Sequence, residues 1–168
     1  MIDSTCCFAN NLKPEAIFSL SEYSKNILAN EFETAISDGY IRFLAALTNE
    51  QDAAAADVLI ETKNKLGNTK TKIKIEAVIE RILLSPGDKR EYIKNRMINF
   101  DGIIVYDETE KFYNINHYLL YYSTRVILLY GDAEEKNKSD YKIDEDNKII
   151  DDFFVASMLY KDVKKIFI

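Results

Sequence analysis

Few residues of this chain are of the types that usually bind zinc. The 168 residues include one histidine, His117, and two adjacent cysteines, Cys6 and Cys7. A zinc site usually needs four ligands, with the cysteines or histidines in short paired spacings, and these three residues have no such spacing. The sequence therefore predicts no metal site. His117 stands at the start of an apolar stretch, where a helix-end histidine is a simpler interpretation than a catalytic base.

The stretch DYKIDEDNKIID, residues 140–151, places acidic residues roughly as a calcium-binding loop would. Lys142 and Lys148 occupy positions that should carry oxygen ligands, and Glu145 stands where such a loop needs its sharp-turn glycine. We therefore interpret this stretch as a solvated acidic loop.

A second acidic group, YDETEK, contains Asp107, Glu108, Glu110 and Lys111, the residue types of a metal-dependent nuclease. Consecutive residues of a strand point to opposite faces, so these four cannot meet at one centre without residues from elsewhere. The five glycines are scattered and form no phosphate-binding loop. We therefore expect a protein that is not an enzyme and has no cofactor.

The first third of the chain has helical periodicity and clear end signals. Apolar residues recur at helical spacing over 14–38, with Pro14 in the first turn and Gly39 at the end. The pattern predicts a second short helix over 40–47 and a third over 49–66. Thr48 with Gln51 resembles a capping box for this third helix, and Gly67 ends it.

The middle of the chain predicts two further helices and a hairpin. Residues 73–84 have helical apolar spacing, although TKTKIKI at the front also alternates like a strand. Ser85 and Pro86 restart a helix. Residues 102–115 form two β-rich arms around a charged turn, which predicts an antiparallel hairpin.

The stretch HYLLYYSTRVILLYG, residues 117–131, is apolar nearly all round. It is too short to cross a bilayer and contains polar side chains that are costly in lipid. Asn116 and Gly131 suit the two ends of a helix over 117–130, while Val126 and Ile127 leave a strand open. Such a helix would be a core element or an interface, and an interface would favour a homodimer through residues 117–130.

The predicted fold is mainly α (α+β), with five to seven helices and one small antiparallel β-hairpin near residues 102–115. A final helix is expected over about 147–165. The turn at 67–72 divides the chain into a helical lobe 1–67 and a lobe 68–168, although one single domain is also compatible with the length. The predicted core contains Ile17, Leu20, Phe32, Ile36, Phe43, Val78, Ile82, Leu119, Val126, Phe153 and Leu159.

The charge and composition favour a protein-binding function. The net charge is −6, and the chain has 11 tyrosines, a residue type that binding surfaces use heavily. We expect an acidic cytoplasmic protein that neutralises a basic protein partner, similar in these bulk features to a bacterial immunity protein that blocks a nuclease toxin. The free thiols and the lack of an apolar run at the start favour the reducing cytosol. The candidate partner-binding residues are Tyr121, Tyr122, Tyr141, Asp144, Glu145, Asp146, Asp151 and Asp152.

The alternative is a winged-helix-like DNA-binding regulator. Residues 68–100 carry eight basic and four acidic residues and precede the expected hairpin, which gives the element order of a winged helix. The sequence pI near 4.9 opposes this alternative, because nucleic-acid-binding domains are usually basic. Nucleic acid is therefore not an expected partner, and neither is a membrane.

Overall fold

The chain forms one parallel β-sheet with helices on both faces. The computed structural model describes residues 4–10, 20–67, 72–107, 114–130 and 162–167. Six strands pair in the order β4-β3-β2-β1-β5-β6, and every pairing is parallel. They are β1 Thr5–Asn10, β2 Arg42–Ala46, β3 Lys74–Glu80, β4 Gly102–Tyr106, β5 Arg125–Tyr130 and β6 Asp162–Phe167. This is an α/β, Rossmann-like fold, so the prediction of a mainly α protein is wrong.

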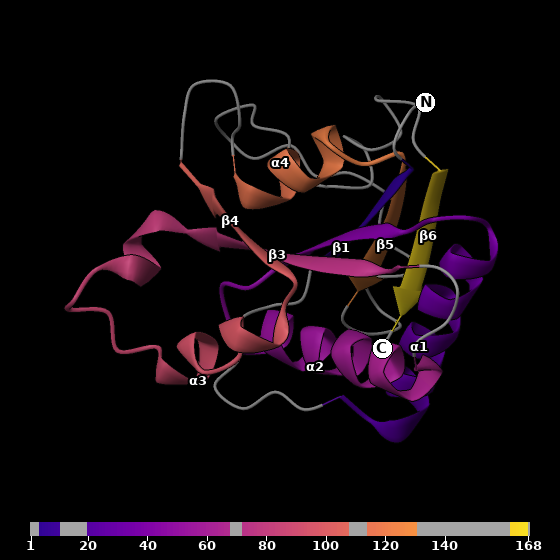
Figure 1. Cartoon of the computed structure of the whole chain (residues 1–168), viewed down its shortest axis with the longest axis horizontal. Coiled ribbons are helices and arrows are strands. Elements are labelled where there is room, and N and C mark those ends of the chain that lie inside the picture. Colours follow the sequence, from indigo (N-terminus) through magenta and orange to yellow (C-terminus); the bar gives the residue numbers. More distant parts are fainter. Residues whose placement is uncertain (1–3, 11–19, 68–71, 108–113, 131–161, 168) are drawn as a thin grey trace.

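The helices lie in two layers around the sheet. Figure 1 shows α1, α2 and α3 on one face and α4 on the other. Because the chain steps from β1 to β4 in one direction and then returns to β5 beside β1, right-handed crossovers place α4 on the opposite face. The helices are α1 Glu22–Ser37, α2 Glu50–Leu66, α3 Glu91–Lys94 and α4 Ile115–Tyr121, with short 3-10 helices η1 Arg81–Leu84 and η2 Met97–Asn99.

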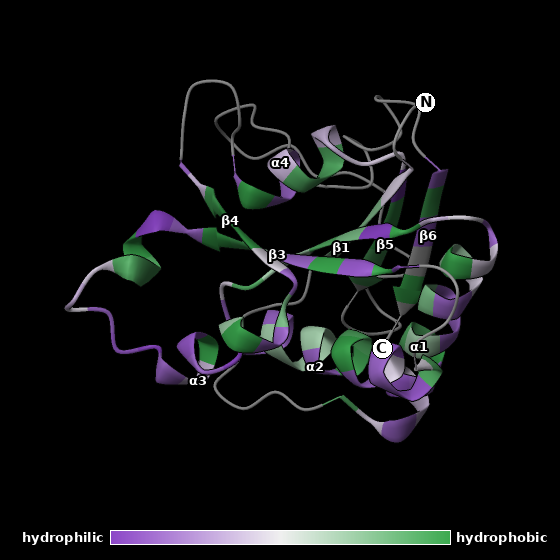
Figure 2. Ribbon diagram, in the orientation of Figure 1, coloured by the Kyte–Doolittle hydropathy of each residue, from purple (hydrophilic) through white to green (hydrophobic). Residues whose placement is uncertain are grey.

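The sheet separates two apolar layers. In β1, Cys6 and Phe8 pack toward α1 and α2, whereas Cys7 and Ala9 pack toward α4. Phe32 and Phe43 meet edge to face with their ring centres 4.6 Å apart in the first layer. Figure 2 shows hydrophobic residues along the strands, interrupted by hydrophilic residues in β3 and β6. The apolar runs of β2 and β5 are expected of parallel strands covered on both faces.

The α2 prediction is confirmed, and the α1 prediction is confirmed in part. Asn49 caps α2 and Gly67, with φ of 66°, follows its end. The capping pair is therefore Asn49 with Asp52, one residue later than the predicted Thr48 with Gln51. A continuous helix from residue 14 is wrong, because Ser21 is extended and caps α1 with its hydroxyl.

Residues 40–47 and 73–84 do not form the predicted α-helices. The first segment contains β2, a strand buried on both faces in the middle of the sheet. The second contains β3 followed by η1, so the strand-like alternation at its front was the better indication. Both segments show short apolar runs because the sheet is covered on both sides, and such runs resemble buried helices.

The predicted hairpin at 102–115 is also wrong. Its first arm is β4, which pairs in parallel with β3, and the part of its second arm that the structure describes begins α4 at Ile115. The winged-helix interpretation depended on that hairpin and loses its structural basis.

Residues 117–130 divide into the rest of α4 and β5. Ser123 and Thr124 make the break: the Ser123 hydroxyl donates to the Leu119 carbonyl, and the Thr124 N–H donates to the Thr5 carbonyl. The next apolar residues are then buried in the sheet, namely Val126, Ile127, Leu128 and Leu129. The surplus of apolar surface that favoured a homodimer is thus covered within the chain, and the homodimer itself stays a prediction.

The last predicted helix and part of the core list need correction. Residues 162–165 belong to strand β6, and residues 147–161 lie outside the described part. Ile82 is 60% exposed, so its assignment to the core is wrong, and Ile36 is only partly buried. Ile17, Phe153 and Leu159 fall outside the described residues. The buried core predictions that are confirmed are Leu20, Phe32, Phe43, Val78, Leu119 and Val126.

Strands from both sides of the turn at 67–72 belong to the same sheet. Within the described ranges, none of the helices is long and apolar enough to cross a bilayer.

Candidate functional site at the carboxyl edge of the sheet

All six strands are parallel, so their carboxyl ends lie along one edge of the sheet. Open α/β sheets bind ligands outside this edge, near the point where the strand order reverses. Here the order reverses between β1 and β5. The residues that follow these two strands, 11–19 and 131–161, are outside the described part, whereas those that follow β2, β3 and β4 are described.

The turn after β2 is held by polar contacts at the start of α2. The Asn49 side chain accepts a 2.8 Å hydrogen bond from the Asp52 N–H. One Asp52 carboxylate oxygen in turn accepts the Thr48 N–H at 2.9 Å and the Thr48 hydroxyl at 2.6 Å. A carboxylate near a helix N-terminus is stabilised by the helix dipole, so Asp52 occupies the position that an anionic ligand would otherwise favour.

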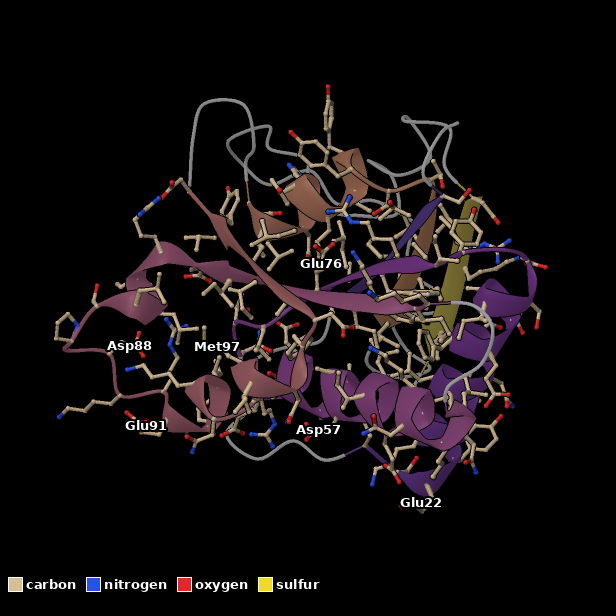
Figure 3. The ribbon with its side chains drawn as sticks, in the orientation of Figure 1. Glu22, Asp57, Glu76, Asp88, Glu91 and Met97 are labelled. Atoms are coloured by element: carbon tan, nitrogen blue, oxygen red, sulfur yellow. The ribbon has the colours of Figure 1, made fainter. Side chains whose placement is uncertain are left out.

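Arg90 links this turn to the segment after β3. Its guanidinium donates to the Thr48 carbonyl at 3.0 Å and to the Asp88 carboxylate at 2.7 Å. Lys94 adds a hydrogen bond from its Nζ to the Asp88 carbonyl. Figure 3 shows Asp88 on the segment between η1 and α3, which these contacts fasten to the start of α2.

Two carboxyl groups at this edge have pKa values shifted in opposite directions. Burial raises the pKa of Asp52, and the hydrogen bonds from Thr48 and the Asn49 backbone offset only part of that rise. The Arg90 guanidinium lowers the pKa of Asp88 to about 2, with help from the Arg90 N–H. Both shifts follow from contacts that hold the backbone, so neither by itself indicates catalysis.

A hollow of about 470 Å³ opens between the ends of β3 and β4 and the start of α4. Arg81 and Asp107, which both line the hollow, form a bidentate ion pair in which one N–O distance is 2.5 Å. The remaining wall combines apolar side chains with a carboxylate and an amide. These residues are Glu80, Ile82, Tyr106, Asn114 and Ile115.

A second hollow, of about 380 Å³, lies between α1, α2 and α3. Its walls include Ala54, Asp57, Tyr92 and Arg96. Arg96 pairs with Asp57 at 3.0 Å, so these two of the charges that border this hollow already have partners.

The predicted partner-binding residues lie elsewhere or outside the described part. Tyr121 and Tyr122 are at the end of α4, 49% and 45% exposed, with their rings 5.1 Å apart in an edge-to-face contact. The structure does not describe the other six, namely Tyr141, Asp144, Glu145, Asp146, Asp151 and Asp152.

The residues considered for metal binding are not brought together within the described ranges. Cys6 and Cys7 are buried free thiols in β1, and burial raises the pKa of Cys6 well above its usual value. His117 is in α4, and burial lowers its pKa. Among the described residues no three histidines, cysteines or carboxylates form a metal-binding group. The stretch 140–151, Glu108, Glu110 and Lys111 lie outside those residues.

Sequence reasoning missed the residues of this edge, although a signal for them was present. Glu80, Asp107 and Thr48 each follow or end a short apolar run of the kind that fills a parallel strand. Had FLAAL, IEAVI and GIIVY been recognised as strands alternating with helices, their following residues would have been expected at one edge. The sequence matches no protein-family model and no curated protein.

Proposed function

We propose that this protein is a non-catalytic binding protein that takes a small polar molecule at the carboxyl edge of its sheet. The observation that carries this proposal is the hollow at the ends of β3 and β4, lined by Glu80, Arg81, Tyr106 and Asp107. Its volume falls within the range of small-molecule sites, and a few polar groups among apolar walls are typical of them. The hollow also lies at the carboxyl ends of the strands, the edge at which open α/β sheets bind ligands, although at β3 and β4 and not at the reversal between β1 and β5.

The residues at this edge do not favour a nucleotide phosphate. Dinucleotide sites use a glycine-rich turn before a helix, whose N–H groups then bind the phosphates. The turn before α2 has the sequence LTNE, without glycine, and residues 11–19 after β1 also contain none. Asp52 and Glu50 add negative charge in the first turn of α2. A phosphate would therefore meet repulsion at this helix.

A screen for stabilising compounds tests the proposal, since a ligand that binds only the folded protein raises its melting temperature. We expect at least one small polar compound of a metabolite panel to do so. Ile82→Trp adds bulk to the wall of the hollow at an exposed position and should remove that effect. Ile98→Trp is the matched control, because Ile98 is 87% exposed and does not line the hollow. Stabilisation that persists in Ile82→Trp would place binding elsewhere.

Binding of a basic protein partner is the second candidate function. The net charge of −6 and the exposed aromatic pair Tyr121 and Tyr122 favour it. Replacement of Asp144, Glu145 and Asp146 by Lys should slow association with such a partner by about tenfold at low salt, and less near 1 M salt because charges are then screened within about 3 Å. An unchanged association rate, measured by surface plasmon resonance, would contradict this candidate.

A further inference from the structure

Glu80 is the last residue of β3 and borders the hollow on the α4 face of the sheet. It is the register partner of Tyr106 on β4, and Tyr106 packs in the apolar cluster that contains Val78 and Leu119. Side chains two residues apart on a strand share a face, so Glu80 points to the same side as Val78. The Glu80 carboxylate and the Tyr106 ring therefore lie next to each other in the wall of the hollow.

The cationic groups near Glu80 are engaged by other acids. Arg81 pairs with Asp107 through two nitrogens, and Arg90 pairs with Asp88 in the same manner. Glu80 is partly buried and forms no hydrogen bond or ion pair with a described residue, although it lies within electrostatic reach of Arg90. A partly buried carboxylate whose cationic neighbours in the described part, Arg81 and Arg90, are already paired with other acids favours the binding of a further cation.

The other walls of the hollow suit an organic cation better than a bare ion. Tyr106 is among the lining residues, and an aromatic ring attracts ammonium and guanidinium groups, while Ile82 and Ile115 supply apolar surface. The volume of about 470 Å³ is far larger than a single ion requires.

We propose that the ligand of this hollow is a small organic cation, an ammonium or guanidinium group on a short apolar body, with Glu80 as its counterion. This inference rests on the proposed small-molecule function and adds the charge of the ligand. The Arg81–Asp107 pair stays formed and is neutral as a pair, so among the described residues that line the hollow the net charge comes from Glu80.

Calorimetric titration of the full chain at low salt tests this inference. The cationic probes are putrescine, agmatine and choline, and the anionic probes are citrate and adenosine monophosphate. At least one cationic probe should bind. Glu80→Gln keeps the shape of the side chain but removes its charge, and it should lower the affinity for that probe tenfold or more. Glu22→Gln is the matched control, because it removes the same charge from the start of α1, on the other side of the molecule in Figure 3. The affinity of the Glu22→Gln variant for the cationic probe should equal that of the wild type.

The outcomes separate this inference from the proposed function. Equal weakening by Glu80→Gln and Glu22→Gln, or no binding of any cationic probe, overturns the organic-cation inference. If citrate or adenosine monophosphate binds instead and Ile82→Trp abolishes that binding, the small-molecule function stands and the cationic class is wrong. If no compound of either charge, in the titration or in the metabolite screen, depends on Ile82, both are wrong.

Discussion

Arg125 at the start of β5 donates a 2.6 Å hydrogen bond to Asp38, which follows the end of α1, although 87 positions of sequence separate them. The same guanidinium donates to Asp162 at the start of β6 at 2.7 Å and lies 4.7 Å from the centre of the Tyr40 ring. Only 12% of the Arg125 side chain is exposed. One side chain thus joins the amino ends of two neighbouring strands to the turn between α1 and β2.

Loss of this side chain should destabilise the protein measurably. We expect Arg125→Ala to lower the free energy of unfolding by about 1 to 3 kcal/mol, since hydrogen bonds between charged groups in a partly buried site are lost. The control is Arg96→Ala, which removes a more exposed guanidinium that pairs with Asp57 and donates to the Tyr92 carbonyl within its own helical turn. This variant should cost less than about 1 kcal/mol. Urea denaturation measures both, and equal costs would contradict the role of Arg125 as a junction.

Two isoleucines three positions apart distinguish the observed strand from the predicted helix at 73–84. Ile79 is fully buried in β3, whereas Ile82 is 60% exposed in η1. Ile79→Ala should cost about 2 to 5 kcal/mol, and Ile82→Ala should change stability by no more than about 0.5 kcal/mol. In a continuous helix both would lie on one face, so similar costs in thermal or urea unfolding would argue for the helix.

Asp52 should make stability fall as pH rises. Its folded-state pKa is raised by burial, so above about pH 4 the folded protein holds the proton more tightly than the unfolded chain. Asp52→Asn removes this dependence and still accepts the hydrogen bonds from Thr48. The stability of the variant relative to the wild type should therefore increase as pH rises from about 4. Thr48→Val removes a hydroxyl donor that lowers the pKa of Asp52, so the stability of this variant should fall more steeply with pH. If the wild type and both variants showed parallel profiles of stability against pH, the raised pKa of Asp52 would be contradicted.

Asp88 should have the opposite effect, so that stability falls as pH is lowered. Its pKa is lowered to about 2 by Arg90, so its contribution to stability is complete above about pH 4 and is lost as pH falls through 2. Asp88→Asn should be less stable than the wild type at neutral pH, and the difference should close between about pH 4 and 2. Chemical denaturation at several pH values measures this, and a gap that is independent of pH would show that the pair with Arg90 contributes nothing.

The helices α1 and α2 could be predicted from the sequence in large part, whereas the strands could not. The predicted end at Gly67 and the start near Asn49 agree with α2 because capping residues act locally. The strands β2 and β5 are covered on both faces, so their apolar runs lack the alternation that distinguishes a strand. The run VILLY was assigned to a helix for this reason, even though the β-branched Val126 and Ile127 favoured a strand.

The candidate site depends on pairing between distant segments. Glu80 and Tyr106 become neighbours only through the parallel register of β3 and β4, and Asn114 joins them because the chain then crosses to the other face. No motif links these residues along the sequence. A prediction of alternating strands and helices would have placed the first two at the same edge, but their charge environment depends on the pairing of Arg81 with Asp107 and of Arg90 with Asp88.

Nuclear magnetic resonance mapping of bound ligand tests the carboxyl-edge site most directly. A compound that raises the melting temperature is titrated into the ¹⁵N-labelled protein, and the amide shifts are followed residue by residue. The proposed function predicts the largest shifts at Glu80, Arg81, Tyr106 and Asp107, with loss of these shifts in Ile82→Trp. Shifts confined to the second hollow, at Ala54, Asp57 and Tyr92, with the carboxyl edge unchanged, would contradict it.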